Sequence, residues 1–417
     1  MREMKDSGIE WIGIIPENWS FSKIGSLYSL RVTKVSDRDY QPLSVTNKGV
    51  LPQLETAAKT NAHDDRKLVC KGDFAINSRS DRRGSCGISP YTGSVSLINT
   101  ILRPITEMNP QYYDWLFHTI QFGDEFYKWG HGIVDDLWTT GWQDMKKITI
   151  PTPPIEEQEQ IASFLDNECS EIDALLSDIQ GQIEALEEYK RSVITEAVTK
   201  GLDPDVEMKD SGVQWMGKIP KHWTVDNPKW HFVQRKDRAT KGLTQLTASQ
   251  KYGVVTQEEY MEITGAKVVT VEKDFDILKL VCPGDFIIHM RSFQGGLEYS
   301  EKYGSISSAY VMLIPQKTIL EPRFYKWFFK SPVYIDALSS TSNLIRDGQA
   351  MRYANFIQLP IPLMPKEEQQ KIADYLDMKC AEIESIIAEK KQQIETIEEY
   401  KKSLIFEYVT GKKKVQA

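Results

Sequence analysis

Apolar side chains recur every three to four residues along two long stretches of the chain, residues 155–200 and 366–409. The recurring positions are Ile172, Leu176, Ile179, Ile183, Leu186, Val193 and Ala197 in the first stretch, and Ile383, Ile387, Ile394, Ile397, Leu404 and Tyr408 in the second. This alternation is typical of a coiled-coil seam. Prolines precede both stretches, and Gly201 and Gly411 follow them, as expected at helix ends. The pattern predicts two helices, each roughly 60–70 Å long at about 1.5 Å per residue.

Two long helices separated by a globular region of the same chain are expected to pack antiparallel. Lys390 stands in the second helix where Ile179 stands in the first, so one layer of the seam should be imperfect. The pair could act only as a rigid spacer. We favour a spacer that also offers a docking surface. The acidic outer face then either has a partner or is simply solvated.

The segments between the helices alternate short apolar runs with turns. Residues 69–77 and 280–289, and then 93–103 and 304–314, have the pattern of strands. Residues 112–119 and 323–330 resemble short aromatic helices. The predicted fold class is therefore α+β, with two mixed α/β domains joined by two long helices that form an antiparallel coiled coil. The topology of the domains stays open.

The chain repeats itself. Residues 4–19, MKDSGIEWIGIIPENW, match residues 208–223, MKDSGVQWMGKIPKHW, at ten of sixteen positions. Further along, Pro154–Gln158 corresponds to Pro365–Gln369, Cys169 corresponds to Cys380, and the sequence Glu-Glu-Tyr-Lys recurs late in both helices. The pattern predicts a pseudo-two-fold internal repeat. It is also circular, so we expect the two chain ends to lie near each other.

Between these anchors the two copies diverge and share only landmarks. The landmarks are Gly72-Asp73-Phe74 with Gly284-Asp285-Phe286, Arg79-Ser80 with Arg291-Ser292, Gly93-Ser94 with Gly304-Ser305, and Tyr113 and Trp115 with Tyr325 and Trp327. One fold used twice with different surfaces indicates two different binding specificities. The predicted domains are residues 1–150 and 204–361, with helical spacers at 151–203 and 362–417.

Charge is distributed unevenly along the 417 residues. The net charge is −8, yet residues 155–200 hold 3 Lys and Arg against 12 Asp and Glu. Residues 17–150 hold 16 basic against 15 acidic residues, and residues 221–361 hold 18 against 14. The globular regions are therefore neutral to slightly basic. DNA binding needs local positive surface rather than a basic total, so this balance is compatible with it.

Polar and basic side chains gather in three predicted loop clusters of each copy. In the first copy they are Ser44, Thr46, Asn47 and Lys48; Arg79, Ser80, Arg82 and Arg83; and Thr139, Thr140, Gln143 and Lys146. In the second copy they are Thr247, Ser249, Gln250 and Lys251; Arg291, Ser292 and Gln294; and Arg346, Gln349 and Arg352. Arg suits guanine edges, Asn and Gln suit adenine edges, and Lys, Ser and Thr suit phosphates. These residues are our candidate DNA contacts; the alternative is that they are ordinary solvated loop residues.

Signatures of catalysis are weak. The sequence has no phosphate-binding GxxxxGK[ST] motif, and Gly130-His131-Gly132 lacks the third glycine of a dinucleotide site. Residues 204–209 imitate a nuclease PD…ExK pattern, but their spacing is too short. The five cysteines form no CxxC pair, so neither a disulfide framework nor a zinc site is expected. There is no apolar run of 18 residues and no signal peptide, so we expect no membrane span and a cytoplasmic location.

The repeated elements together resemble those of the specificity (S) subunits of type I restriction-modification systems. They are MKDSGxxWxGxIPxxW, PxxEQxxIAxxLD and EEYKxSxIxExVT, and they occur twice in the order domain, helix, domain, helix over essentially the whole chain. The resemblance implies a non-catalytic subunit with two target-recognition domains. Each domain reads one half of a split double-stranded DNA site, and two non-identical domains imply an asymmetric site.

The resemblance also implies partners. Two methyltransferase (M) subunits would bind the repeated regions, and restriction (R) subunits would join through that complex. S-adenosylmethionine, ATP and magnesium would belong to those partners, with no cofactor in this chain. Candidate docking residues in the repeated regions are Trp11, Trp215, Gln158, Gln369, Tyr189 and Tyr400.

Two other functions compete with this hypothesis. A stand-alone DNA-binding regulator or coiled-coil scaffold would need no enzyme partner, but repeated helical faces suit two copies of one partner. A self-sufficient methyltransferase or nuclease should carry its own catalytic motifs, which the sequence lacks.

Overall fold

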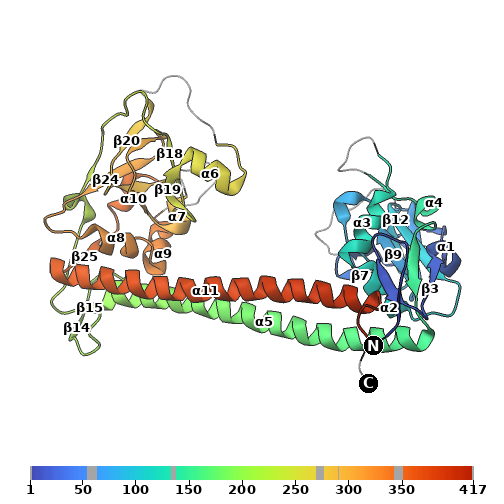
Figure 1. Cartoon of the computed structure of the whole chain (residues 1–417). Helices are drawn as coiled ribbons and strands as arrows, with labels where there is room; N and C mark the ends of the chain where they lie inside the picture. The colour runs from blue at the N-terminus through green and yellow to red at the C-terminus, as the bar shows by residue number, and fades with distance from the viewer. Residues whose placement is uncertain are drawn as a thin grey trace. The chain divides into compact units, whose positions relative to one another are not determined.

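The chain forms two compact units, which Figure 1 shows with their helices and strands labelled. The computed structural model describes residues 2–53, 63–132, 138–268, 277–289, 291–341 and 351–415. Unit 1 comprises Met1–Gln180 and Lys391–Ala417, and unit 2 comprises Gly181–Lys390. Each unit therefore contains a β-rich part and one half of each long helix, α5 (Ile155–Lys200) and α11 (Lys366–Val409).

Unit 1 is built on small antiparallel sheets. Its strands pair as β1 (Met4–Asp6) with β2 (Ile14–Pro16), β3 (Ser20–Lys23) with β13 (Thr149–Thr152), and β6 (Leu43–Thr46) with β7 (Gly49–Pro52). A four-stranded sheet has the order β10 (Cys86–Ile88), β9 (Phe74–Asn77), β12 (Asn99–Pro104) and β4 (Tyr28–Leu30). A three-stranded sheet has the order β11 (Gly93–Ser96), β8 (Arg66–Val69) and β5 (Lys34–Val35).

Unit 2 repeats these pairings. They are β14 (Met208–Asp210) with β15 (Lys218–Pro220), β16 (Thr224–Asp226) with β25 (Ile361–Leu363), β18 (Leu246–Ser249) with β19 (Gly253–Thr256), and β20 (Lys279–Val281) with β23 (Gly304–Ile306). Its four-stranded sheet has the order β17 (Phe232–Gln234), β24 (Val311–Pro315), β21 (Phe286–Ile288) and β22 (Glu298–Tyr299). The sequence repeat is therefore a repeat of strand topology.

Short helices complete each unit. In unit 1 they are α1 (Ile24–Leu27), η1 (Ser80–Arg82), α2 (Pro110–Phe117), α3 (Ile120–Lys128) and α4 (Trp142–Met145). In unit 2 they are η3 (Pro228–Trp230), α6 (Gln257–Thr264), α7 (Ser292–Gly295), α8 (Pro322–Phe328), α9 (Pro332–Ser340) and α10 (Tyr353–Phe356). Proline at the first position starts α2, α8 and α9, because it has no N–H to leave unpaired there. Helices α2 and α8 confirm the two predicted aromatic helices.

The Gly-Asp-Phe landmark marks a buried ion pair in each unit. The Asp73 carboxylate accepts hydrogen bonds from Arg31 at 2.6 and 2.9 Å and from the Cys70 amide at 2.8 Å. Asp285 does the same with Arg235 at 2.7 and 2.8 Å and with the Cys282 amide at 2.9 Å. The pair fixes the turn before β9 or β21, and the next residue, a phenylalanine, enters the core.

The Gly-Ser landmark follows from a close backbone approach. A side chain at Gly93 would place its Cβ 2.5 Å from the carbonyl oxygen of Gln41, and one at Gly304 would come equally close to that of Thr244. Those contacts leave no space for a side chain, so glycine is required at both positions. The segment before β6 or β18 can therefore lie against the sheet edge.

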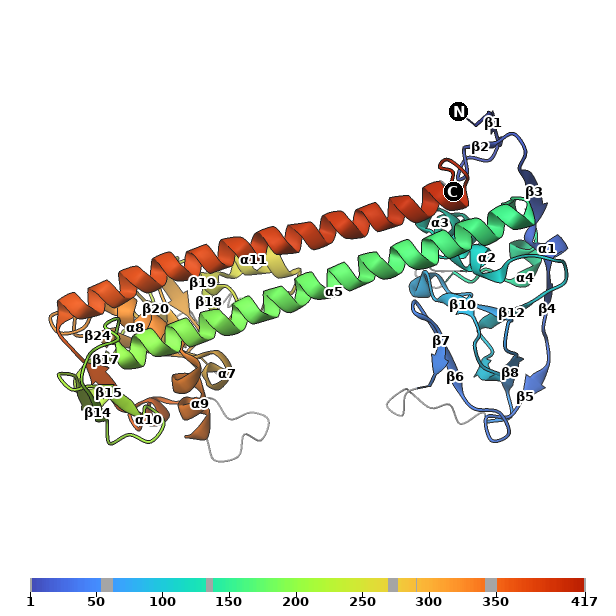
Figure 2. The same cartoon turned by 90° about the horizontal axis from the view of Figure 1, so that it is seen from below.

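The two long helices pack antiparallel within each unit, as Figure 2 shows. In unit 1, Phe164 of α5 packs on Tyr408 of α11 with ring centroids 4.4 Å apart, and Asp173 further along α5 binds Lys401 at 2.6 Å. In unit 2, Gln182 and Lys190 of α5 bind Lys390 and Glu384 of α11. Lys390 is thus a polar residue on the pairing surface, as predicted. The α+β fold with two β-rich regions and two long helices in contact is confirmed.

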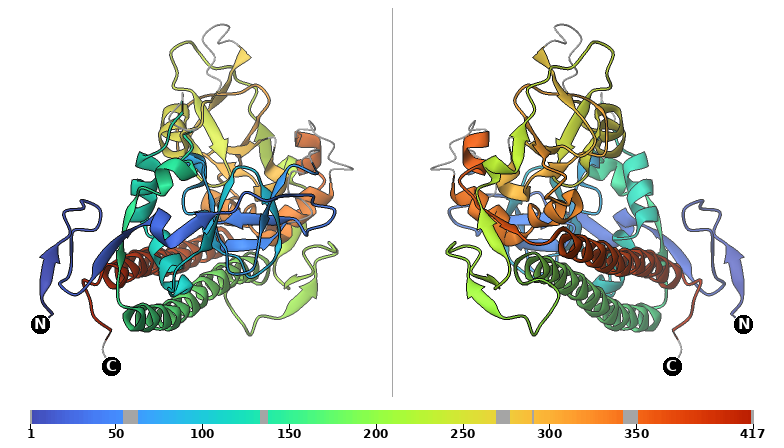
Figure 3. Two further views of the ribbon diagram at one scale, coloured as in Figure 1. Left: turned by 90° about the vertical axis from the view of Figure 1, so that its right-hand side faces the viewer. Right: turned by 90° about the vertical axis from the view of Figure 1, so that its left-hand side faces the viewer.

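Both chain ends belong to unit 1, as Figure 3 illustrates. Gly411 adopts φ +71° and lies against Pro16 and Trp19, and Gly201 adopts φ +75° and lies against Pro220 and Trp223 in unit 2. The residue that follows α11 therefore contacts the first copy of the repeat in unit 1, just as the residue that follows α5 contacts the second copy in unit 2. The prediction that the ends lie near each other is confirmed. The predicted domain boundaries stay predictions, and the compact units divide each long helix near its middle.

Candidate nucleic-acid interface

A polar groove opens on unit 1 between the β6–β7 hairpin and the turn that contains η1. It has a volume of about 600 Å³. We call it groove 1, and the polar residues that line it are Ser44, Thr46, Asn47, Gln53, Arg66, Asn77, Asp81, Arg82, Arg83, Ser85, Ser96 and Asn99. The structure thus brings together two loop clusters that the sequence places more than thirty residues apart.

The arginines beside groove 1 already have acidic partners. Asp81 binds Arg79 at 2.9 Å and lies 3.8 Å from Arg82, and Asp124 binds Arg83 at 2.5 Å. All of these side chains are substantially exposed. Exposed ion pairs contribute only about 0–1 kcal/mol, so exchange of such a partner for a DNA phosphate costs little. Lys48, at the tip of the hairpin, is exposed.

The third predicted cluster of unit 1 is divided by the fold. Thr139 forms an isolated bridge with Arg79, which places it near the second cluster. Thr140 is buried and donates its hydroxyl to the Phe126 carbonyl, so it supports the core. Gln143 is exposed, and the carbonyl of the half-buried Lys146 accepts a hydrogen bond from Gly25. Neither of these two residues lines groove 1.

Unit 2 presents the equivalent surface with other side chains. Thr247 and Ser249 lie on β18, and Gln250 donates to the Arg291 carbonyl at 3.0 Å, so the first two clusters also meet here. Ser292 is buried and accepts the His289 amide. The remaining described candidates, Lys251, Arg291, Gln294 and Arg352, are exposed. Arg346 and Gln349 lie outside the described residues.

Seven polar residues of groove 1 are not among the sequence candidates: Gln53, Arg66, Asn77, Asp81, Ser85, Ser96 and Asn99. Arg66, Asn77, Ser96 and Asn99 lie in strands, whereas the candidates come from predicted loops. Arg66 is buried and bonds Ser94, so it has a structural role. For Asn77 and Asn99 the signal in the sequence was a polar residue at the end of a strand. Each of these residues differs from its counterpart in the second copy.

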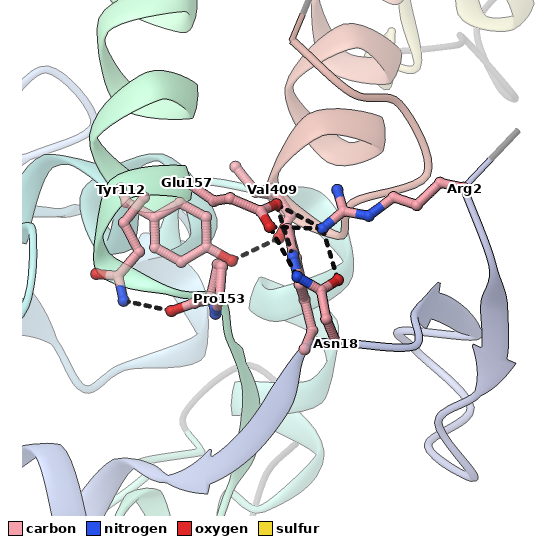
Figure 4. A network of polar contacts seen from close by, with 8 residues as sticks. Arg2, Asn18, Tyr112, Pro153, Glu157 and Val409 are labelled. Atoms are coloured by element: carbon pink, nitrogen blue, oxygen red, sulfur yellow. Dashed lines mark hydrogen bonds and ion pairs between the residues drawn. The ribbon is translucent and has the colours of Figure 1, made fainter.

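A polar network fixes the start of each long helix to its own unit, and Figure 4 shows that of unit 1. Glu157 accepts the Trp19 indole N–H at 2.9 Å and also binds Arg2 and Asn18. Burial opposes ionisation, but these hydrogen bonds outweigh it and lower the pKa of Glu157. In unit 2, Glu368 accepts the Trp223 indole at 2.9 Å and contacts His222.

A second set of contacts joins the helices to the aromatic short helices. Trp115 donates its indole N–H to Asp166 of α5, and Trp327 donates to Asp377 of α11, both at 2.8 Å. The Tyr112 hydroxyl donates to the Val409 carbonyl at 2.7 Å, at the end of α11. The helices are therefore held by side-chain hydrogen bonds as well as by apolar packing.

The candidate docking residues divide into internal and exposed positions. Gln158 and Gln369 are buried, and their amides bond backbone groups of the same unit, including Asn109 and Glu321. Trp11 packs on Phe122, and Trp215 packs on Phe328 and Tyr334. Tyr189 and Tyr400 are 50% and 54% exposed. Of the six candidates, only the two tyrosines have mostly accessible side chains.

Tyr189 lines a largely apolar groove of about 740 Å³ on unit 2, at the end of α5. Val193, Ala197, Leu202, Val206 and Met208 contribute to its walls. An accessible apolar groove of this kind is typical of a surface that contacts another protein.

The described residues give little support for a catalytic site. Among the described residues, no group of three or more His, Cys, Asp or Glu side chains could hold a metal ion. All five cysteines are free, and burial raises the pKa of Cys169 and Cys380 to about 11, which disfavours the reactive thiolate. Within the same described part of the chain, no helix is long and apolar enough to cross a bilayer.

Comparison with known proteins finds similarity to one family. A model described as the type I restriction modification DNA specificity domain matches residues 16–185. The type I restriction enzyme MjaVIII specificity subunit of Methanocaldococcus jannaschii is 25% identical over 432 residues, which cover 96% of this chain and 94% of that protein. The putative MjaX specificity subunit of the same organism is 26% identical over 278 residues, covering 65% of this chain and 61% of that protein, less than two thirds of its length.

A solved structure supports the fold. A chain from a study of complex assembly and conformational transition in the type I system aligns with a TM-score of 0.70 at 12% identity, covering 95% of this chain and 98% of that chain. This likeness concerns the fold, whereas the matches of sequence concern the family. From the family model and the full-length relative, the chain resembles the specificity subunits of type I restriction-modification systems, the non-catalytic subunits that recognise the DNA target.

Proposed function

We propose that this chain reads an asymmetric, split DNA site, with the recognition domain of unit 1 on one half and that of unit 2 on the other. The observation that carries the proposal is that the units share their strand pairings but differ at equivalent surface positions. Asn47 corresponds to Gln250, and Asn77 to His289. Two identical domains would favour a palindrome, whereas two different domains favour unlike half-sites.

The chemistry of groove 1 suits a DNA base edge beside phosphates. Asn47, Asn77 and Asn99 offer amides of the kind that read adenine, and Arg82 and Arg83 stand at its edge. Because their ion pairs are exposed, these arginines can exchange a carboxylate for a phosphate or a guanine. In unit 2, Lys251 and Arg291 would take the phosphate-binding role.

We further propose that two methyltransferase subunits bind the chain, one to each repeat. Tyr189 and Tyr400 occupy equivalent positions in the repeat and are both accessible, which supports two copies of one partner. Restriction subunits would join through that complex. S-adenosylmethionine, ATP and magnesium would be held by those partners, and the assembly would act in the cytoplasm.

The long helices would set the separation of the two half-sites. Both α5 and α11 are unbroken along their lengths, and 46 residues correspond to about 69 Å at 1.5 Å per residue. A helix that continues from one unit into the other is stiffer than a loop, so it favours a fixed gap between half-sites.

The test is co-expression with a type I methyltransferase subunit, followed by co-purification and genome-wide mapping of methylated bases. We expect a stable complex that methylates one split, asymmetric sequence. Replacement of both Tyr189 and Tyr400 by alanine should weaken complex formation at least tenfold. Tyr303→Ala is the matched control, because Tyr303 is 56% exposed and lies outside the long helices.

Three outcomes would contradict the proposal. A palindromic site would refute different half-site preferences, and an unchanged affinity of the double tyrosine variant would refute docking at those positions. Sequence-specific DNA binding by a chain that never binds a methyltransferase subunit would instead support the stand-alone regulator.

A further inference from the structure

The central hairpin of each recognition domain ends in a pair of polar residues that face each other across the strands. In unit 1, β9 and β12 pair Phe74 with Leu102, and three residues further along they pair Asn77 with Asn99. In unit 2, β21 and β24 pair Phe286 with Leu313, and His289 and Tyr310 lie three residues further along in the same register. The rings of His289 and Tyr310 have centroids 6.3 Å apart. The two pairs are therefore structurally equivalent and chemically different.

One side chain of each pair is buried and leaves a polar atom without a partner. Asn99 is 4% exposed, and its side-chain oxygen Oδ1 accepts no hydrogen bond, although its backbone carbonyl binds Lys67 at 2.7 Å. His289 is 5% exposed, and its Nε2 has no hydrogen-bond partner. Buried polar atoms are nearly always paired, so an unpaired atom in the equivalent residue pair of each unit, on Asn99 in one pair and on the counterpart of Asn77 in the other, points to an external partner.

The geometry assigns each atom a hydrogen-bonding role. Asn99 lines groove 1 together with Asn77 and Asn47, and its unpaired oxygen can only accept. In His289 the Nδ1 atom accepts the Arg291 amide at 3.2 Å, so the proton is on Nε2, which donates. The Glu298 carboxylate, 3.7 Å from Nε2, is too far for a hydrogen bond and binds Lys330.

We propose that these paired positions contact a base edge and set the specificity of each half-site with opposite polarity. This rests on the proposed function. The Asn99 oxygen selects a base that presents an amino group in the major groove, adenine N6 or cytosine N4. The His289 Nε2 selects a base that presents an acceptor there, such as guanine O6 or thymine O4.

The test uses the complex of the full chain with its methyltransferase subunit, and maps methylated sites before and after substitution. Asn99→Leu keeps the size and removes the acceptor, so we expect roughly tenfold lower discrimination at one base pair of one half-site. Asn99→Asp keeps an acceptor and should retain the preference for an amino-bearing base. The other half-site is an internal control, and Asn167→Leu, at an exposed asparagine of α5, is the matched control.

The second unit gives an independent arm. His289→Leu removes the donor and should relax the other half-site, whereas His289→Gln restores a donor amide near the Nε2 position and should retain its preference. If an Asn99→Leu complex fails to assemble, the Asn99→Asp and His289→Gln maps still decide the outcome, because a changed base class in either would overturn the inference.

Failure of this inference is distinguishable from failure of the proposed function. If the unsubstituted complex methylates a split site, but Asn99→Leu and His289→Leu leave every base preference unchanged, only the base-contact inference is wrong. If either substitution changes both halves, the positions act on folding rather than on base recognition. If the unsubstituted chain supports no methylation, the proposed function itself is refuted.

Discussion

Replacement of Asp73 by asparagine should selectively weaken unit 1. The Asp73 carboxylate is 3% exposed and accepts two hydrogen bonds from Arg31 and one from the Cys70 amide. Asparagine keeps one acceptor but turns an amide NH₂ toward the guanidinium. Breaking a buried ion pair costs about 3–5 kcal/mol, and the 19% exposure of Arg31 lets water compensate part of that loss. We therefore expect Asp73→Asn to cost about 3 kcal/mol.

Hydrogen exchange measured by mass spectrometry resolves that effect in one unit. A loss of about 3 kcal/mol should speed the exchange of peptides covering β8, β9 and β12 by about a hundredfold, at 1.36 kcal/mol per factor of ten. Peptides covering β20, β21 and β24 of unit 2 should be unchanged and serve as the internal reference. Asp285→Asn should reverse the pattern.

An exposed ion pair provides the matched control. Lys34 and Asp65 are 2.6 Å apart with side chains 65% and 48% exposed, so Asp65→Asn should cost less than about 1 kcal/mol. Equal exchange rates in Asp73→Asn and Asp65→Asn would refute the reasoning, because the buried carboxylate would then contribute no more than an exposed one.

Two further predictions concern ionisable groups. Burial opposes ionisation of Glu157, but hydrogen bonds from Arg2, Trp19 and Asn18 outweigh it, so the pKa of Glu157 lies below its ordinary 4.5. The stability that the ionised carboxylate contributes is therefore complete above about pH 4.5 and is lost as the pH falls through the lowered pKa. As the pH falls from about 5 to about 3, the denaturant midpoint of the unsubstituted chain should therefore fall more steeply than that of Glu157→Gln. Parallel curves for the two proteins would count against this prediction. Burial raises the pKa of Cys169 and Cys380 to about 11, so about one thiol in a thousand is ionised at pH 8, and iodoacetamide should label both at least tenfold more slowly in the folded chain than in urea. Equal labelling rates in peptide mass spectra would show that burial does not protect them.

The repeat and the helices could be predicted from sequence because their signals are local. The three-four spacing of apolar residues predicts a seam, and Gly201 and Gly411 end the helices where the pattern stops. The landmarks were visible as identities, but their causes were not. The need for glycine at Gly93 arises from the backbone of Gln41, more than fifty residues away.

The candidate site was predictable only in part, because it depends on register between distant strands. Asn47 and Arg82 were candidates as loop residues, but only the β6–β7 hairpin and the η1 turn bring them to one groove. Asn77 and Asn99 become neighbours through the pairing of β9 with β12, which periodicity does not determine. Burial was equally invisible in sequence: Thr140 and Gln158 have polar side chains that bind the backbone inside unit 1.

The division of the chain into units has a consequence for biosynthesis. Unit 2 is one continuous segment, Gly181–Lys390, whereas unit 1 needs Lys391–Ala417 in addition to its first 180 residues. Leu404 and Val409 belong to the core of unit 1, and the Tyr112 hydroxyl binds the Val409 carbonyl. Domains usually fold as they leave the ribosome, N-terminal first. In this protein unit 1 begins to emerge first but is completed only when residues 391–417 have been translated, after the whole of unit 2 has emerged.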